Sequence, residues 1–386
     1  MTGDSSVASP RILCVHQGGE LYGSDRSFLQ AVQALRASWP MAHIKVVLAV
    51  DGPLRGPLEK VADIVQIRDL CVLRLANLAS TLLKSTIGLP WYVFAALRDL
   101  YYADLAYINT TVIADYMIAA RFASQKSVIH VREIPKPKAM PVVRSIVGAS
   151  RARLIYNSHA TMAAFAFQDS RPQAVLHNGV DPISDATAPT TDRFGADRPL
   201  RLAMLGRISD WKGQDLLIQG VAALSPIDRA KMRVRIVGSA FRNAPEPIDA
   251  LEAQISDAGL TGIVTLEPFK DDPSEVYRWA DVCAVPSRLP EPFGRVAAEA
   301  MAFARPVIAA NHGGLVEIIE DGKSGWLFKP NDVLSLQAVL HQAINEERMV
   351  QDRGSAALSR FEEYFSSATM QSRLCNILSD WIPKLI

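Results

Sequence analysis

Short apolar runs alternate with longer helical patterns along this chain, and this alternation limits the fold more than any other feature. RILCVHQ at 11–17 is followed by the helical pattern of 24–38 and then by IKVVLAV at 44–50. Further strand candidates are LAYIN (105–109), SVIHV (127–131), RLIYNS (153–158) and AVLH (174–177). Because the runs are apolar throughout and do not alternate with polar residues, they predict parallel strands that are buried on both faces and covered by helices.

A polar segment at 181–199, rich in Pro, Asp, Thr and Ala, interrupts the pattern and indicates a linker. The alternation then restarts with RLAMLGRI (201–208), MRVRIVGS (232–239), IVTLEPF (263–269), VCAVPS (282–287) and RPVIAA (305–310). A length of 386 residues also favours two domains. We therefore expect two doubly wound α/β domains that face each other across a cleft lined by the carboxyl ends of both sheets. The predicted domains are 1–190 and 198–365, with a last helix at about 366–386 that packs back on the first.

Composition narrows the class of protein. The formal net charge of +1 argues against general nucleic-acid binding, although residues 1–190 hold 19 Lys or Arg and 14 Asp or Glu while residues 191–386 hold 22 and 26. The four cysteines are scattered singly, without the spacing of a metal site or a disulfide framework. The first ten residues do not resemble a signal peptide, and no apolar run reaches the ~20 residues of a spanning helix. We expect a cytoplasmic protein without a metal site.

Ligands of open α/β sheets bind where strands end, so the loops that follow the strands hold the candidate site residues. In GRISDWKGQD (206–215), Arg207 and Lys212 lie five residues apart before a helix that begins near Gly213. The fork of an arginine and the point charge of a lysine together suit a diphosphate. Either cation alone is more often a solvated surface residue, and the position at a strand end favours the binding role.

The loop QGGELYGS (17–24) follows the first strand candidate. Its glycines, Gly18 and Gly19, allow backbone N–H groups to approach an anion at the start of the next helix. The geometry of a strand-to-helix turn explains them equally well. The chain has neither G-x-G-x-x-G nor the Walker pattern, so a plain dinucleotide or P-loop site is excluded.

The stretch EPFGRVAAE (291–299) places two carboxylates on either side of a Pro-Phe-Gly break. Glu291 precedes a proline and is expected in a loop, while Glu299 lies in a helix that begins near Gly294. The first turn of this helix offers free backbone N–H groups to an anion, and carboxylates accept hydrogen bonds from sugar hydroxyls. Hydroxyl-binding groups at both ends of an anion site describe a site for a nucleotide sugar.

Two other interpretations of these carboxylates stay open. Glu291 and Glu299 are also candidates for the acid and the nucleophile of a glycosidase, which needs two carboxyl groups ~5–10 Å apart. A glycosidase has no need for diphosphate-binding cations or for a second nucleotide-binding domain. Each carboxylate taken alone is also an ordinary loop or helix-surface residue, and the combination with 206–213 is what favours the nucleotide sugar.

An ordered set of motifs resembles the donor-binding domain of family 4 retaining glycosyltransferases, which have the GT-B fold of two Rossmann-like domains. The motifs are GRISDWKG, VRIVGS, ADVCAVPS, EPFGRVAAEAMAFARPVIAANHGGLVEII and DGKSGWLF. The resemblance is dense over about 200–335 and thinner in the first domain, where it rests on the glycine pair at 18–19, SVIHVRE (127–133), YNS (156–158) and HNGVD (177–181). It implies a sugar transferase of the type that assembles bacterial polysaccharides.

The resemblance implies roles for the charged candidates. Glu299 would bind the nucleotide ribose, and Glu291 would bind hydroxyls of the transferred sugar. Arg207 and Lys212 would bind the diphosphate and stabilise it as it departs. His130 matches the position of a histidine that often faces the donor sugar, although a lone histidine is also often a structural residue.

It implies further contacts with the donor. The backbone of Phe293 and Gly294 would line the sugar site. Arg295 stands where the family usually has an apolar residue, which would alter selection of the donor. Gly18 and Gly19 would approach the phosphate from the opposite wall.

The implied reaction transfers a glycosyl group from a nucleotide sugar to an acceptor hydroxyl, with retention at the anomeric carbon. The chain lacks the Asp-x-Asp pair expected where a divalent metal bridges the diphosphate, so we expect neither a metal nor another cofactor. Two alternatives of the same fold stay open. A nucleotide-sugar epimerase would interconvert donors without an acceptor, and a non-catalytic nucleotide-sugar sensor would release its ligand unchanged.

The first domain is expected to bind the acceptor. Residues 121–153 hold eight Lys or Arg, among them Arg132, against the single acid Glu133, and 85–105 carries five aromatic residues. Aromatic residues with flanking cations suit an interfacial helix on an anionic bilayer, although an ordinary core helix is equally consistent. The expected acceptor is a saccharide, lipid-linked in our hypothesis, in exopolysaccharide, O-antigen (lipopolysaccharide) or capsule assembly at the inner face of the plasma membrane.

Overall fold

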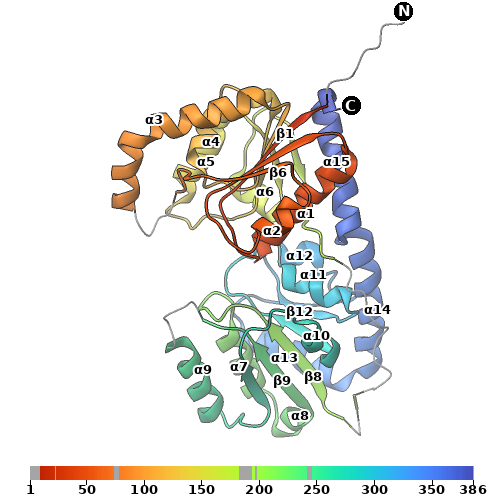
Figure 1. The fold of residues 1–386 in the computed structure, drawn as a ribbon. Coiled ribbons are helices and arrows are strands. Elements are labelled where there is room, and N and C mark those ends of the chain that lie inside the picture. The colour runs from red at the N-terminus through yellow and green to blue at the C-terminus, as the bar shows by residue number, and fades with distance from the viewer. Residues whose placement is uncertain are drawn as a thin grey trace, which may run out of the picture. The chain divides into compact units, whose positions relative to one another are not determined.

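The computed structural model describes residues 9–21, 23–73, 78–181, 194–195, 198–240 and 246–385. The chain divides into two compact units (Figure 1). Unit 1 comprises Met1–Gly179 together with Ser367–Ile386, and unit 2 comprises Val180–Ser366. The predicted linker at 181–199 and the predicted end of the first domain at 190 lie for the most part outside the described residues.

Unit 1 is built on a parallel sheet with the strand order β3-β2-β1-β4-β5-β6-β7. Its strands are β1 (Arg11–His16), β2 (His43–Leu48), β3 (Ile64–Ile67), β4 (Leu105–Ile108), β5 (Ser127–Val131), β6 (Arg153–Tyr156) and β7 (Gln173–Val175). Its helices are α1 (Gly23–Ser38), α2 (Arg55–Glu59), α3 (Leu78–Tyr102), α4 (Ala114–Ala120), the 3-10 helix η2 (Ser124–Lys126), α5 (Met140–Ser150), α6 (His159–Phe165), α15 (Ser367–Trp381) and the 3-10 helix η3 (Pro383–Leu385).

Both faces of this sheet are covered because successive side chains of a strand point to opposite faces. In β1, Ile12 and Cys14 pack in one core cluster with α1 and α15. Leu13 and Val15 pack in the other cluster with α3, α4 and α5. The continuous apolar run of β1 is therefore explained by burial on two sides, as the sequence predicts for parallel strands.

The last helix of the chain belongs to unit 1. Met370, Leu374 and Leu378 recur at a spacing of four, so they form one buried face of α15, which packs against α1 (Figure 1). The amide of Gln30 on α1 donates to the hydroxyl of Ser367 at 3.0 Å, which fixes the start of the helix. Trp381 is partly buried against the same cluster.

Unit 2 repeats this architecture with the strand order β10-β9-β8-β11-β12-β13. Its strands are β8 (Leu200–Leu205), β9 (Met232–Val237), β10 (Val264–Glu267), β11 (Val282–Val285), β12 (Val307–Ala310) and β13 (Gly325–Phe328). Its helices are α7 (Gln214–Ala222), α8 (Pro226–Ala230), α9 (Glu246–Asp257), α10 (Ser274–Trp279), α11 (Arg295–Ala302), α12 (Leu315–Ile318), α13 (Val333–Asn345) and α14 (Glu347–Tyr364). Leu202 and Met204 of β8 pack on one face and Ala203 on the other.

Each sheet reverses its strand order at one point. In unit 1 this switch point lies between β1 and β4, and in unit 2 it lies between β8 and β11. The loops that leave a sheet at its switch point diverge to opposite faces and leave room for a ligand. The loop with Gly18 and Gly19 follows β1, and the loops with Arg207 and with Glu291 follow β8 and β11, so the sequence candidates lie at the two switch points.

Candidate active site

Two loops of unit 2 meet at its switch point and bring Lys212 and Glu291 into contact. Lys212 lies in the loop between β8 and α7, and Glu291 in the loop between β11 and α11. Lys212 Nζ donates to Glu291 Oε1 at 2.7 Å, and the hydroxyl of Ser287 donates to the same oxygen at 2.6 Å. Glu291 is only 5% exposed. Two residues that the sequence predicts for separate ligand groups therefore form one ion pair.

Glycines shape these loops so closely that a side chain would not fit. Gly213, the N-cap of α7, has φ +80°, and a Cβ there would lie 2.1 Å from the carbonyl oxygen of Pro286. Gly294, the N-cap of α11, has φ +105°, and a Cβ there would lie 2.6 Å from Leu315. Both φ values lie in the left-handed region that glycine adopts without strain. The two glycines therefore fix the backbone conformation of these loops and allow them to pack closely.

A small cavity of about 120 Å³ lies beside the ion pair. Lys212, Ser287, Glu291, Gly294 and Arg295 contribute to its walls. The first turn of α11 begins at its edge, so the positive end of that helix and the Lys212 ammonium are both near the space. This arrangement suits an anion held next to a hydroxyl-bearing group.

Three further candidates surround the pair. Phe293 is buried at 3% exposure and packs edge-on against Phe365, and the predicted contact of its backbone with the sugar stays a prediction. Arg207 is exposed at the start of its loop, and its carbonyl oxygen accepts a hydrogen bond from the Gln214 side chain. Among the described residues, Arg207 and Glu299 do not contribute to the walls of the small cavity.

Glu299 lies one helical turn beyond Arg295 on α11, and the two form an ion pair with Nε and Oε1 2.8 Å apart. The hydroxyl of Tyr277 donates to the other carboxylate oxygen at 2.8 Å. Burial and the nearby Glu299 carboxylate raise the pKa of the Tyr277 phenol, so it stays a protonated donor. Sequence reasoning missed Tyr277 because it lies on α10 in a helix without a ligand motif.

Unit 1 carries a buried chain of polar groups at the carboxyl edge of its sheet. Asp25 Oδ1 lies 2.8 Å from His16 Nε2, and His16 Nδ1 lies 3.1 Å from the Asn109 amide nitrogen. Arg132 Nε donates to Asn109 Oδ1. A Cβ on Gly18 would lie 2.0 Å from Asp25 Oδ1, so this chain of contacts requires a glycine there. His16 ends β1 and Asn109 directly follows β4, and this position at a strand end is the signal that could have identified them.

The packing of the same loop also requires glycine at position 19. A Cβ there would lie 2.7 Å from the carbonyl oxygen of Val50 and 3.0 Å from that of Asp51. The packing of the loop thus accounts for both glycines. Their predicted contact with a phosphate stays a prediction.

His130 is the last but one residue of β5 and is almost fully buried. Its Nδ1 faces the Tyr107 hydroxyl and lies 3.2 Å from Arg132 Nη2. A guanidinium donates only, so Nδ1 accepts and the neutral ring carries its proton on Nε2. Burial and the charge of Arg132 lower the pKa of His130 well below its ordinary value. Within the described part of the chain Nε2 has no partner, which leaves one buried donor available to a ligand oxygen.

The predicted basic patch of 121–153 is not one surface. Arg132 is 8% exposed and belongs to the buried polar chain, so its assignment to a membrane-facing patch is wrong. Arg144 donates to the carbonyl oxygens of Phe165 and Ala166, which it holds in place beyond α6. The charge of this segment is therefore divided between an internal network and separate surface sites.

The described residues hold neither a metal-binding cluster nor a membrane-spanning helix. Within these ranges no group of three His, Cys, Asp or Glu side chains is placed to hold a metal ion. No helix in them is both long enough and apolar enough to cross a bilayer.

Residues 193–360 match the family model described as "Glycosyl transferases group 1". The D-inositol 3-phosphate glycosyltransferase of Rhodococcus opacus (strain B4) is 32% identical over 233 residues, which are 55% of this chain and 50% of that protein. The mannosylfructose-phosphate synthase of Agrobacterium fabrum (strain C58 / ATCC 33970) is 32% identical over 183 residues, 46% of this chain and 40% of that protein. The chain therefore aligns with about half the length of the curated relatives that it matches.

The fold is shared over nearly the whole chain. The crystal structure of Anabaena Alr3699/HepE in complex with UDP and glucose superposes with a TM-score of 0.76 and 24% sequence identity, covering 96% of this chain and 100% of that one. The fold of two doubly wound α/β domains that the sequence predicts is confirmed by this likeness and by the two parallel sheets.

Proposed function

We infer that this chain, whose residues 193–360 match the family model described as "Glycosyl transferases group 1", is a glycosyltransferase that moves a sugar from a nucleotide-sugar donor to an acceptor hydroxyl. The observation that carries the proposal is the Lys212–Glu291 ion pair beside the first turn of α11, at the switch point of unit 2. A cation, the positive end of a helix and a carboxylate there match the diphosphate and the hydroxyls of such a donor.

Binding of the donor would rearrange this ion pair. The Lys212 ammonium has three donor hydrogens, of which the bond to Glu291 uses one. A diphosphate next to Lys212 would take the others and draw the ammonium away from the carboxylate. Glu291 would then accept hydrogen bonds from sugar hydroxyls, with Ser287 keeping it in place. Arg207 and the backbone of Phe293 and Gly294 complete the proposed donor site.

Glu299 is the proposed partner of the ribose hydroxyls. A carboxylate has about four lone-pair positions, so the bonds from Arg295 and Tyr277 leave acceptor capacity for two hydroxyls. These two partners fix the rotamer of Glu299 before a ligand arrives, which lowers the entropy cost of binding. Arg295 holds Glu299 in this way and also contributes to the wall of the small cavity.

Transfer is proposed to proceed with retention. The bond from the anomeric carbon to the diphosphate oxygen breaks, the bond to the acceptor oxygen forms on the same face, and the proton of the acceptor hydroxyl passes to the departing diphosphate. The main catalytic demand is the charge that develops on the departing diphosphate, and Lys212, Arg207 and the start of α11 are fixed positive groups for it. We propose that they replace a divalent metal, and that His130 donates through Nε2 to the donor sugar.

The experiment that tests the function is nucleotide release from UDP-, GDP-, ADP- and dTDP-sugars by the purified full chain, with EDTA present. We expect acceptor-dependent release from one donor, and UDP is favoured because Anabaena Alr3699/HepE has been crystallised with UDP-glucose. EDTA should change the rate by less than about twofold, because loss of a required metal would remove several kcal/mol of charge stabilisation.

Three other outcomes of this assay would contradict all or part of the proposal. Interconversion of donors without an acceptor would identify an epimerase. Binding with release of unchanged ligand would identify a sensor. A rate that EDTA abolishes and added Mg²⁺ or Mn²⁺ restores would contradict the metal-free step while leaving the transferase in place.

The proposed acceptor is a lipid-linked saccharide in the assembly of a cell-surface polysaccharide, at the cytoplasmic leaflet. Helix α3 supports this with four exposed aromatic side chains, and such rings suit the interface of a bilayer. They are Trp91, Phe94, Tyr101 and Tyr102, and they are 73%, 59%, 78% and 59% exposed.

Liposome flotation tests this location. We expect the chain to float with anionic vesicles at low salt and Trp91→Ser to reduce the floated fraction several-fold, because an exposed indole adds apolar area to the contact. Phe269→Ser, which removes an exposed ring from unit 2, is the matched control and should float like the parent. Absence of flotation, or equal effects of both variants, would contradict the membrane location.

A further inference from the structure

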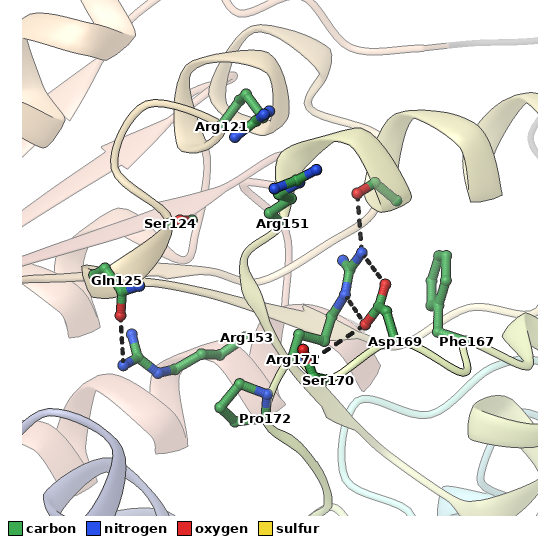
Figure 2. A pocket seen from close by; sticks show the side chains of 11 residues that line it. Arg121, Ser124, Gln125, Arg151, Arg153, Phe167, Asp169, Ser170, Arg171 and Pro172 are labelled. Carbon is green, nitrogen blue, oxygen red and sulfur yellow. Dashed lines mark hydrogen bonds and ion pairs between the residues drawn. The ribbon is translucent and has the colours of Figure 1, made fainter.

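A cavity of about 790 Å³ opens in unit 1 at the amino-terminal edge of its sheet (Figure 2). Its walls are formed by Arg121 at the end of α4, by residues of η2, by the turn that joins α5 to β6 and by the turn before β7. His130 and the polar chain of His16 and Asn109 lie toward the carboxyl-terminal edge of the same sheet. The cavity is therefore separate from the candidate site residues of unit 1, and its size is typical of small-molecule sites.

Four arginines and a single carboxylate line this cavity. They are Arg121, Arg151, Arg153 and Arg171, against Asp169. Arg171 has a structural task, because its Nε and Nη2 bind both oxygens of Asp169 at 2.6 and 2.5 Å and its Nη1 and Nη2 donate to carbonyl oxygens near the end of α5 (Figure 2). The only lining carboxylate is thereby neutralised, and three arginines are left to set the charge of the space.

Arg153, the first residue of β6, has donors that are buried without a partner. Its Nε and Nη1 make no hydrogen bond within the part of the chain that the structure describes. Nη2 makes one long contact of 3.4 Å to the side chain of Gln125. Burial lowers the pKa of Arg153, which reflects the cost of holding a cation there. A buried donor without an acceptor is unfavourable, so these atoms require a ligand oxygen or water.

Arg151 and Arg121 add two guanidinium groups without an ion-pair partner among the described residues, and Figure 2 draws no contact for either. Arg151 follows α5 with φ +52°, in the left-handed conformation that favours glycine at the end of a helix. An arginine is therefore held at a position where glycine would be less strained. Replacing Arg151 with glycine would therefore remove the guanidinium group without straining the backbone.

We propose that this arginine cavity binds a phosphate-bearing anion, carried either by the headgroup of an anionic lipid or by a soluble metabolite. Arginine forks bind phosphate oxygens in pairs, and three of them around one space match a mono- or diphosphate group. Two features beside the cavity favour a lipid. Phe122, next to Arg121, has an aromatic ring that is 76% exposed. Lys126 of η2 donates to the carbonyl oxygen of Tyr101, which ties η2 to the end of the aromatic helix α3. The inference does not depend on the proposed transferase activity.

The first test is calorimetric titration of the full chain with pyrophosphate at low salt. Arg151→Gly should keep or raise the thermal midpoint, since it relieves the left-handed residue, and should weaken the pyrophosphate binding of this cavity by about tenfold or more. Ala166→Gly is the matched control, because Ala166 caps α6 with φ +47° and carries no charge. Lys212→Ala identifies any separate component that binds at the unit 2 site.

The second test distinguishes the two sources of the anion by co-sedimentation with phosphatidylcholine vesicles, with and without phosphatidic acid. Binding that needs phosphatidic acid and is lost in Arg151→Gly assigns the cavity to a lipid headgroup. Pyrophosphate binding that depends on Arg151, without vesicle binding, assigns it to a soluble phosphate. No binding in either assay that depends on Arg151, or an equal loss in Ala166→Gly, overturns the proposal. Neither result bears on sugar transfer, which is measured separately.

Discussion

Replacing Lys212 with alanine is expected to lower kcat/KM for sugar transfer by about 10²–10³-fold, the usual effect of removing one group that stabilises developing charge. Lys212 lines the small cavity and contacts Glu291 there at 2.7 Å. The overall fold should persist, because the lysine lies in a loop and remains partly exposed. Steady-state kinetics with the donor found in the release assay, together with circular dichroism, measures both expectations.

The ion pair gives this prediction a second, sharper form. Lys212→Ala leaves the Glu291 carboxylate nearly buried with only Ser287 as a described side-chain partner, so part of the loss reflects an unpaired charge and not a missing phosphate contact. In Lys212→Ala/Glu291→Gln the two effects should therefore combine non-additively, by about 0.5–3 kcal/mol. Lys323→Ala removes an exposed lysine of unit 2 and should leave kcat/KM unchanged. Activity of Lys212→Ala within about threefold of the parent would reject the proposed diphosphate contact.

Arg132→Met should destabilise unit 1 by about 3 kcal/mol, because the side chain connects several buried polar groups that methionine cannot satisfy. Its donors reach Asn109, Asn178 and His130, and the first two would each lose the donor that binds their Oδ1 atom. Because the chain has two units, the free energy of unfolding should be read from hydrogen exchange of amides in unit 1 and not from one global transition.

The same variant has an effect on titration. The charge of Arg132 is one of the two causes that lower the pKa of His130, so its removal should raise that pKa toward the ordinary value of a histidine. The ring signals in an NMR titration measure the change. Arg144→Met serves as control, because Arg144 donates to two backbone carbonyls away from the ring and should leave the His130 pKa unchanged. An unchanged exchange rate and an unchanged pKa in Arg132→Met would show that the polar chain is not coupled.

Sequence patterns predicted the strands that are buried on both faces and the loops that follow them. They missed β3 (Ile64–Ile67) and β13 (Gly325–Phe328), which are four-residue strands at the edges of their sheets. Four residues are too few for a periodic pattern to distinguish a strand from a turn or a helix, and the edge strand β10 was predicted only as part of the longer run 263–269. The expected strand AVLH at 174–177 overlaps β7 (Gln173–Val175) and is displaced from it for the same reason.

Pairings between distant residues could not be predicted from spacing. Lys212 and Glu291 are 79 positions apart, and only the neighbouring positions of β8 and β11 in the sheet bring their loops together. From the sequence, the cations of 121–153 were also expected to form one basic patch. The structure buries Arg132 toward the carboxyl ends of the strands and places Arg121 and Arg151 at the amino-terminal edge. Closeness in sequence therefore does not show whether two side chains lie at the same end of the strands.

The packing of α15 on α1 makes unit 1 discontinuous in sequence, and this affects how the chain is made. The apolar face of α1, with Phe28 and Leu35, packs in one cluster with Leu374 and Leu378, which are synthesised only after unit 2. At about 5–20 residues per second, the ribosome needs roughly 10–40 s to pass from Gly179 to the end of α15. During that time all of unit 2 emerges, whereas the first-made unit waits with part of its core uncovered. Unit 2 can complete its fold during translation, and the nascent unit 1 is the part exposed to chaperones and aggregation.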